Sequence, residues 1–170
     1  MIFDELERAI VDFSATLDDV IRESMIAHKE DLLHEQREQL FEGKASSGDD
    51  LRPFYSEDLF YRGGYFLTPE SADRYREWKE QLTYPTRVVK QNPDAPNLYI
   101  NGRFHNELDI DFGGSAMCFG GSTPYSDKIV SKYGEENFGL TDERMQGICD
   151  EYTKEDIINN LLDKIYESID

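Results

Sequence analysis

The side chains best suited to chemistry in this 170-residue chain are carboxylates that lie two positions apart. Asp109 and Asp111 alternate with apolar residues, so a strand would carry both on one face, with Glu107 beside them. Carboxylate oxygens that converge can hold a hard cation such as Mg²⁺ or Ca²⁺, but such a site usually needs several of them. Any strand with one face in water shows the same alternation. We therefore predict no metal site, and the sequence leaves open whether this pair binds a cation.

Other residue types that carry catalysis are present, but not in a catalytic pattern. His28 and His34 are six positions apart, so on a helix they point to different faces, and His105 lies far along the chain. The Gly-Gly pairs lack the Lys-Ser/Thr of a phosphate-binding loop, and no nucleophile elbow is present. Cys118 and Cys149 have no CxxC spacing and predict free thiols. The sequence predicts no enzyme, no catalytic residue and no cofactor.

The net charge of −18 argues against a nucleic-acid-binding protein, because binding to phosphates depends on Lys and Arg. The acidity is concentrated at both ends: residues 1–50 and 98–170 each have a net charge of −9, while residues 51–97 hold seven acids and seven bases. No apolar run is long enough to cross a bilayer. The first five residues lack the basic and apolar regions of a secretion signal, so we expect a cytosolic start.

The neutral middle segment is also rich in aromatic residues, with nine of the chain's 21 Phe, Tyr and Trp. Interface cores are enriched in aromatics and depleted of acids, so we predict an oligomer or partner interface in this segment. Burial in the core of the subunit is the ordinary alternative. The candidate interface residues are Phe54, Tyr55, Phe60, Tyr61, Tyr65, Phe66 and Trp78.

The elements that would position these residues begin with a long amphipathic helix. Apolar residues from Phe3 onward recur at spacings of three and four, which predicts a helical arm over residues 1–42, either continuous or broken once near residues 24–28. A flexible linker and an irregular segment follow it. Thr68 and Pro69 are typical of a helix start, so we expect a helix from Pro69 to about Leu82, and then an extended, proline-rich connection.

The last part of the chain predicts a small sheet and more helix. A strand over residues 108–112 would turn at Gly113-Gly114 in a two-residue hairpin and return over residues 115–119, and the glycines after Phe119 would end the sheet. A short helix over residues 125–133 and a final helix capped by Thr141 follow. We expect an α+β fold in a single domain over residues 1–170: a long N-terminal helix, an antiparallel Gly-Gly hairpin and, within residues 98–170, a C-terminal helix packed on the sheet.

Three segments resemble a known family. They are GKASSGDDLRPFY at residues 43–55, PNLYINGRF at residues 96–104 and SKYGEENFGLT at residues 131–141. Their order resembles that of the phage neck proteins, also called tail-completion or head–tail joining proteins, and is most similar to those of crAss-like phages. The two later segments are the more specific, and both are turn and capping sequences.

The resemblance implies a structural virion protein without catalytic activity. Its members form rings, commonly six- or twelvefold, that join the portal to the tail and surround the DNA channel, so the implied partners are copies of the chain and the portal and tail proteins. The implied location is the virion neck, assembled in the host cytoplasm. We expect residues 51–97 and one terminal helix to supply the ring contacts. An acidic DNA mimic or adaptor that binds a basic host or phage protein is the alternative.

Overall fold

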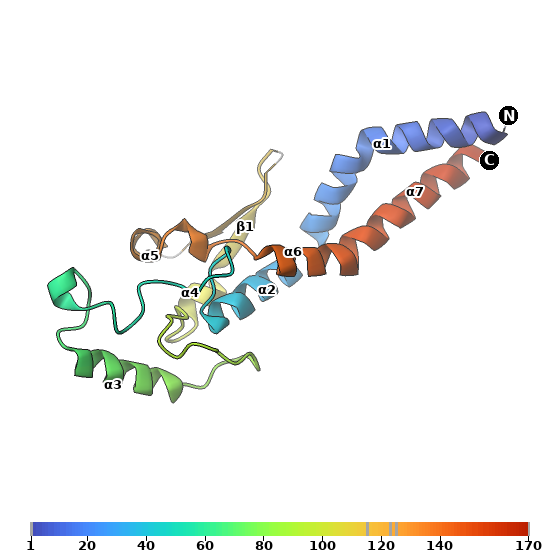
Figure 1. Ribbon diagram of the computed structural model, residues 1–170. Helices are drawn as coiled ribbons and strands as arrows, with labels where there is room; N and C mark the ends of the chain where they lie inside the picture. The colour runs from blue at the N-terminus through green and yellow to red at the C-terminus, as the bar shows by residue number, and fades with distance from the viewer. Residues whose placement is uncertain (1, 115, 123, 125, 170) are drawn as a thin grey trace. The chain divides into compact units, whose positions relative to one another are not determined.

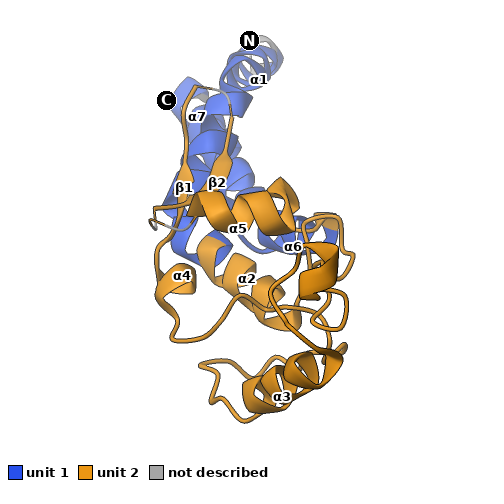
Figure 2. Cartoon of the chain, turned by 90° about the vertical axis from the view of Figure 1, so that its left-hand side faces the viewer, with its two compact units in different colours: residues 1–32, 143–170 blue, residues 33–142 orange. Residues whose placement is uncertain are grey.

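The computed structural model describes residues 2–114, 116–122, 124 and 126–169, with the backbone alone for Ile2, Asp4 and Ile169. The sequence predicted one domain over residues 1–170, and the chain divides into two compact units. Unit 1 consists of residues 1–32 and 143–170, and unit 2 of residues 33–142 (Figure 2). The α+β class is confirmed, with a long N-terminal helix, one two-stranded antiparallel sheet and a C-terminal helix among the described residues.

Unit 1 is built on a pair of helices, α1 (Ile2–Ala27) and α7 (Lys154–Ile169), which lie side by side (Figure 1). The apolar spacing read from the sequence produces this pairing, because Ala9, Phe13 and Val20 are buried on one face of α1. Helix α1 ends at Ala27 and α2 (Lys29–Glu42) begins after His28. Of the two alternatives, a continuous helix or one broken near residues 24–28, the structure has the broken one.

The final helix differs from the prediction. Helix α6 (Asp142–Ile148) begins directly after Thr141, but a π-helical turn, η3 (Cys149–Thr153), separates it from α7. A π turn inserts one extra residue into a helix and widens it locally. Here the hydroxyl of Ser24 donates to that of Thr153 at 3.3 Å, and both side chains are buried.

Unit 2 surrounds α2, whose Leu33, Leu40 and Phe41 are buried. The predicted start of α3 (Pro69–Glu80) is confirmed: the Thr68 hydroxyl accepts the Ser71 N–H at 3.3 Å, and the Ser71 hydroxyl in turn accepts the Thr68 N–H. The shorter elements of this unit are η1 (Phe60–Arg62), α4 (Arg103–Asn106), α5 (Ser126–Tyr133) and η2 (Glu135–Asn137).

The sheet pairs β1 (Leu108–Asp111) with β2 (Cys118–Gly121), so Ile110 lies opposite Phe119. The predicted two-residue turn is wrong, because pairing ends at Asp111 and Cys118 and a longer loop joins them. The glycines after Phe119 do not end the sheet either. A Cβ on Gly121 would lie 2.9 Å from the Ser126 hydroxyl and 3.4 Å from the Phe104 ring, so the strand passes close to both side chains. Ser115 and Tyr125, which the predicted strand and helix included, lie outside the described residues.

Candidate functional site

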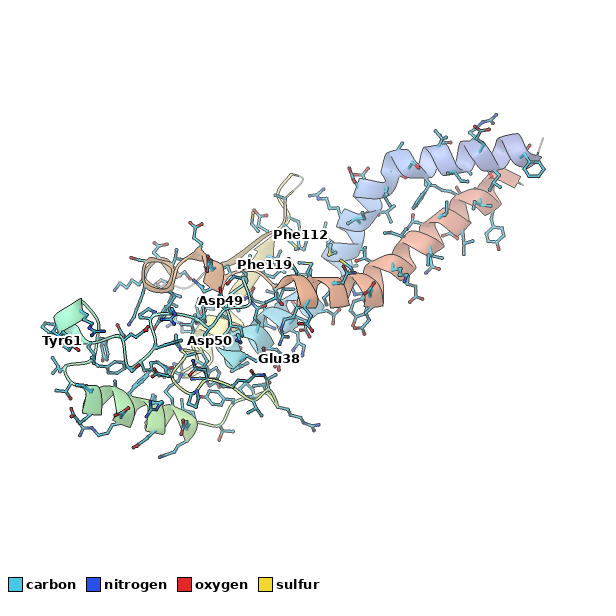
Figure 3. The ribbon with its side chains drawn as sticks, in the orientation of Figure 1. Glu38, Asp49, Asp50, Tyr61, Phe112 and Phe119 are labelled. Atoms are coloured by element: carbon cyan, nitrogen blue, oxygen red, sulfur yellow. The ribbon has the colours of Figure 1, made fainter. Side chains whose placement is uncertain are left out.

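The exposed aromatic residues of the middle segment gather on one loop of unit 2, residues 59–67, which we call the aromatic loop. Phe60, Tyr61 and Tyr65 are 66%, 68% and 74% exposed. Figure 3 shows Tyr61 projecting outward from the short turn η1. Trp78, on the outer side of α3, is partly exposed and contacts Tyr75. These four side chains remain available for a partner in the isolated chain.

The backbone of the aromatic loop is closed by its own hydrogen bonds. The Phe60 N–H donates to the Phe66 carbonyl at 2.7 Å, and the Phe66 N–H donates to the Asp58 carbonyl at 2.8 Å. Gly64 lies directly against Asp58, because a Cβ at this position would be 2.4 Å from the Asp58 carbonyl oxygen. Gly63 has a φ of +85°, which L side chains rarely adopt. The aromatic rings therefore stand on a defined loop.

Two residues of the predicted interface belong to the core instead. Tyr55 and Phe66 are only 5% and 6% exposed and pack with Leu59 and Ala72. Phe66 points inward because the loop that exposes its neighbours holds its backbone against Asp58. Burial raises the pKa of the Tyr55 phenol above its ordinary value. Phe54 is half-buried, with the Arg52 guanidinium 4.1 Å above its ring.

An ion pair between buried Asp58 and partly exposed Lys132 anchors the aromatic loop to α5. The Asp58 side chain is almost fully buried, and its Oδ2 lies 2.5 Å from Lys132 Nζ. Its Oδ1 accepts the Tyr65 N–H at 3.2 Å. An open hollow of about 490 Å³ lies beside this pair and is also lined by Arg62 and Glu57. Because both Asp58 oxygens are occupied, we assign Asp58 to holding the loop rather than to catalysis.

The carboxylates first considered for a cation remain on a solvent-facing edge. Asp109 and Asp111 are exposed on β1, and Asp109 Oδ1 accepts the Ile110 N–H at 2.9 Å. Glu107 pairs with Arg103 at 2.9 Å. Over the described residues, no group of three or more His, Cys, Asp or Glu side chains is arranged to hold a metal ion. Cys118 and Cys149, both described, are free thiols, as their spacing predicted.

The segment PNLYINGRF folds into a turn that buries Asn97 and Phe104 and exposes Ile100. His105, which follows it, is 2% exposed and shares a hydrogen bond of 3.0 Å between its Nε2 and the Asn97 carbonyl. Its ring packs 4.4 Å from Phe41 and 5.4 Å from Tyr99, centroid to centroid. Burial lowers the pKa of His105 to about 4, so this imidazole is neutral at pH 7. The segment's visible role is to pack the turn against α2.

Lys79 is the most unusual charged residue in unit 2. It is only 3% exposed, and its ammonium donates to the Tyr99 carbonyl. Burial lowers the pKa of Lys79 to about 7, and the charge of Lys90 contributes to the shift. A lysine with such a pKa can serve as a nucleophile where substrate reaches it. The enclosure of Lys79 gives it a structural role instead.

The segment SKYGEENFGLT is held by two glutamines of α2. Gln36 donates to the Asn137 carbonyl at 3.2 Å and accepts the Gly139 N–H at 2.7 Å. Gln39 donates to the Gly139 carbonyl at 2.9 Å and accepts the Thr141 N–H at 2.8 Å. Both glutamines are fully buried. Together they pair with the segment much as a neighbouring strand would, and we call them the glutamine clamp.

The sequence prediction missed both the clamp and part of the exposed surface. Gln36 and Gln39 occupy positions in register with the buried Leu32, Leu33 and Leu40, and a polar residue in an apolar stripe was the available signal. Leu67 is 73% exposed at the end of the aromatic loop. Its neighbour Phe66 is buried, and no periodicity in this irregular segment distinguishes the two residues.

No helix among the described residues has the length and apolarity needed to cross a membrane. The two later segments that carry the resemblance, residues 96–104 and 131–141, are packed against α2. Phe60, Tyr61 and Tyr65 of the aromatic loop are exposed. A scan of protein-family models, a search of curated proteins and a search of solved structures each found no match to this chain.

Proposed function

We propose that this chain is a structural virion protein of a phage neck, where copies form a ring that connects the portal to the tail around the DNA channel. The observation that carries the proposal is the aromatic loop, which presents Phe60, Tyr61 and Tyr65 to solvent on a hydrogen-bonded frame. Exposed aromatic side chains on a defined backbone are suited to the centre of a protein–protein interface.

The segments that resemble the neck proteins agree with an assembly role. The two later segments serve as packed turns, one beside His105 and the other in the glutamine clamp. A ring needs two different surfaces on each subunit, because rotational contacts are heterologous. The aromatic loop would supply one of them, and a different surface of the next copy would receive it.

The charge of the chain suits a channel through which DNA slides. A net charge of −18 repels phosphates, so an acidic surface facing the channel would keep DNA from adhering. The same charge favours a second candidate function, an acidic adaptor or DNA mimic that binds a basic host or phage protein. The two candidates differ in assembly, since a mimic acts without a ring.

The test is negative-stain imaging of the purified chain, alone and with the portal protein of the same genome. We expect closed rings, or layers stacked on the portal. A variant with Phe60→Ser, Tyr61→Ser and Tyr65→Ser should lose them, while Val89→Ser, at a site 80% exposed outside the loop, should keep them. Wild-type protein that stays monomeric in both samples would overturn the proposal. A monomer that displaces DNA from a basic protein would support the mimic instead.

A further inference from the structure

Helices α1 and α7 of unit 1 run antiparallel, and the contacts between them identify a polar side of the pair. Where the start of α1 meets the end of α7, Glu5, Arg8 and Asp12 line a hollow of about 300 Å³ together with Lys164 and Glu167. Acids and bases alternate across this hollow, so the charges on this side can neutralise one another.

The opposite side of the pair is apolar. Along α1, Ala9 and Phe13 are buried, and a row of apolar residues lies at helical spacing on the side of them away from Glu5, Arg8 and Asp12. Along α7, a similar row lies away from Lys164 and Glu167. We call these two rows the apolar hairpin face; its members are Phe3, Leu6, Ile10, Leu17, Ile158 and Leu162.

Much of the apolar hairpin face is open to solvent. Phe3 is 86% exposed, and Ile10, Ile158 and Leu162 are 47%, 49% and 42% exposed. Leu6 and Leu17 are half-buried. Two helices cannot enclose a core between them alone, and helices in water owe most of their stability to packing of an apolar face. A third helix laid along this face would bury these side chains.

The charges around the face define what that third helix must carry. Residues three or four apart are neighbours on a helix, which places Glu7 beside Phe3 and Ile10, and Glu155 beside Ile158. Lys154 is four positions before Ile158, so one base also lies beside the face. The ranges of unit 1 hold 17 acids and six bases, a net charge of −11. A partner that brings basic residues would be attracted to this side.

We propose that the apolar hairpin face is a docking site for a basic amphipathic helix of another protein, which completes a three-helix bundle with α1 and α7. A second copy of the hairpin is disfavoured as the occupant, because it would bring a further net charge of −11 against the first. The inference goes beyond the proposed ring and does not depend on it, because the aromatic loop belongs to the other unit.

The experiment uses the full chain and a designed probe. The probe is a synthetic peptide of about 18 residues, five helical turns, with Leu on one face and Lys on the other. Controls are a peptide of the same composition without helical spacing, and a Leu and Glu version of the probe. We expect titration calorimetry to detect binding of the Leu and Lys probe alone. Binding should weaken as salt rises from about 0.05 to about 0.5 M, because flanking charges are screened.

Variants of the chain locate the binding. Ile10→Ser with Leu162→Ser should weaken binding by about tenfold or more, as expected when central apolar contacts are lost. Val11→Ser with Ile26→Ser is the matched control, because both residues are exposed apolar side chains on other faces of α1. The control should bind as the wild type does, and circular dichroism should show that both variants keep their helix content.

Three results would overturn the inference. One is equal binding of the spaced and unspaced basic peptides, since charge alone would then suffice. Another is an Ile10→Ser and Leu162→Ser variant that is folded and binds like the wild type. The third is a wild-type dimer in sedimentation equilibrium that the same substitutions dissociate, because a second copy would then be the occupant. The aromatic-loop variants should not change peptide binding or dissociate such a dimer. Failure of the docking proposal is therefore distinguishable from failure of the proposed ring.

Discussion

The imidazole of His28 stacks on the phenol ring of Tyr152, with ring centroids 4.1 Å apart and an interplanar angle of 17°. His28 marks the break between α1 and α2, and Tyr152 lies in the π turn η3, so the contact joins the two irregular points of unit 1. Asp31 and Asp156 lie 3.2 and 3.6 Å from the two ring nitrogens of His28. The stacked pair therefore fixes where α7 meets the end of α1.

A double-mutant cycle tests this contact. We expect His28→Ala and Tyr152→Ala to couple by about 1 kcal/mol in the free energy of unfolding, the usual size for an aromatic pair. Urea denaturation followed by circular dichroism gives the four stabilities. His34→Ala combined with Tyr152→Ala is the control, since His34 is exposed, and it should show additive effects. Additive effects for the stacked pair would mean that it adds nothing to stability.

The glutamine clamp predicts a large cost for removing one amide. Gln39→Leu leaves the Thr141 N–H and the Gly139 carbonyl without their partner, and each unpaired buried group costs about 1–3 kcal/mol. We expect a loss of about 2–4 kcal/mol in the free energy of unfolding. Gln146→Leu, at an exposed helical position, should change it little. Equal stabilities of the two variants would show that the clamp is dispensable.

Gly64 is the position where a single methyl group should do most damage. In Gly64→Ala the new Cβ would meet the Asp58 backbone at 2.2–2.4 Å, which neither segment can accommodate without moving. Overpacking of this kind typically costs about 1–3 kcal/mol. We expect a lower melting temperature and loss of the Asp58–Lys132 pair. Gly120→Ala, where nothing lies within 4 Å of the added Cβ, is the control in the same unit and should melt close to the wild type.

His105 predicts a loss of stability in mild acid. Its pKa in the folded chain is about 4, below the ordinary 6.5, so between these values the unfolded chain binds a proton that the folded chain does not. Stability is therefore fully present above pH 6.5 and falls as the pH drops toward 4, by about 1 kcal/mol per pH unit. His105→Gln should flatten this slope between pH 6.5 and 5, and His34→Gln, at an exposed position, is the control variant.

Lys79 predicts a gain of stability as the pH rises above 7. Its pKa is about 7 in the folded chain and ordinarily 10.5, so the unfolded chain binds the extra proton between these values. Stability should rise from pH 7 to 9 by roughly 1 kcal/mol per pH unit from this residue. Lys79→Met should remove this residue's share of the rise. Exposed Lys128→Met is the control and should preserve the wild-type slope.

The sequence predicted best where a local pattern determines the structure. Thr68 and Pro69 start α3 because capping depends on adjacent residues, and the alternation from Leu108 to Asp111 gave β1. Gly113-Gly114 could form a two-residue turn, but the strands pair in another register, with Asp111 opposite Cys118, so that prediction was wrong. The π turn also depends on a tertiary contact, the pair Ser24 and Thr153, which no local spacing reveals.

The candidate site was likewise predicted only in part. Composition identified residues 51–97 as unusual, and Phe60, Tyr61, Tyr65 and Trp78 are exposed as an interface requires. It could not separate them from Tyr55 and Phe66, because the aromatic loop has no regular period and its hydrogen bonds to Asp58 decide which rings turn inward. The ring, its partners and its place in a virion stay predictions.

Because α1 and α7 are antiparallel, the first turns of one and the last turns of the other lie side by side, as the shared lining by Glu5 and Glu167 shows. An affinity tag fused to either end would therefore emerge close to Phe3 and the docking face that it helps to form. An acidic tag there would itself attract the basic helix, and a protonated polyhistidine tag would repel it. Purification handles should be cleaved off, or placed in the loop between β1 and β2, before binding is measured.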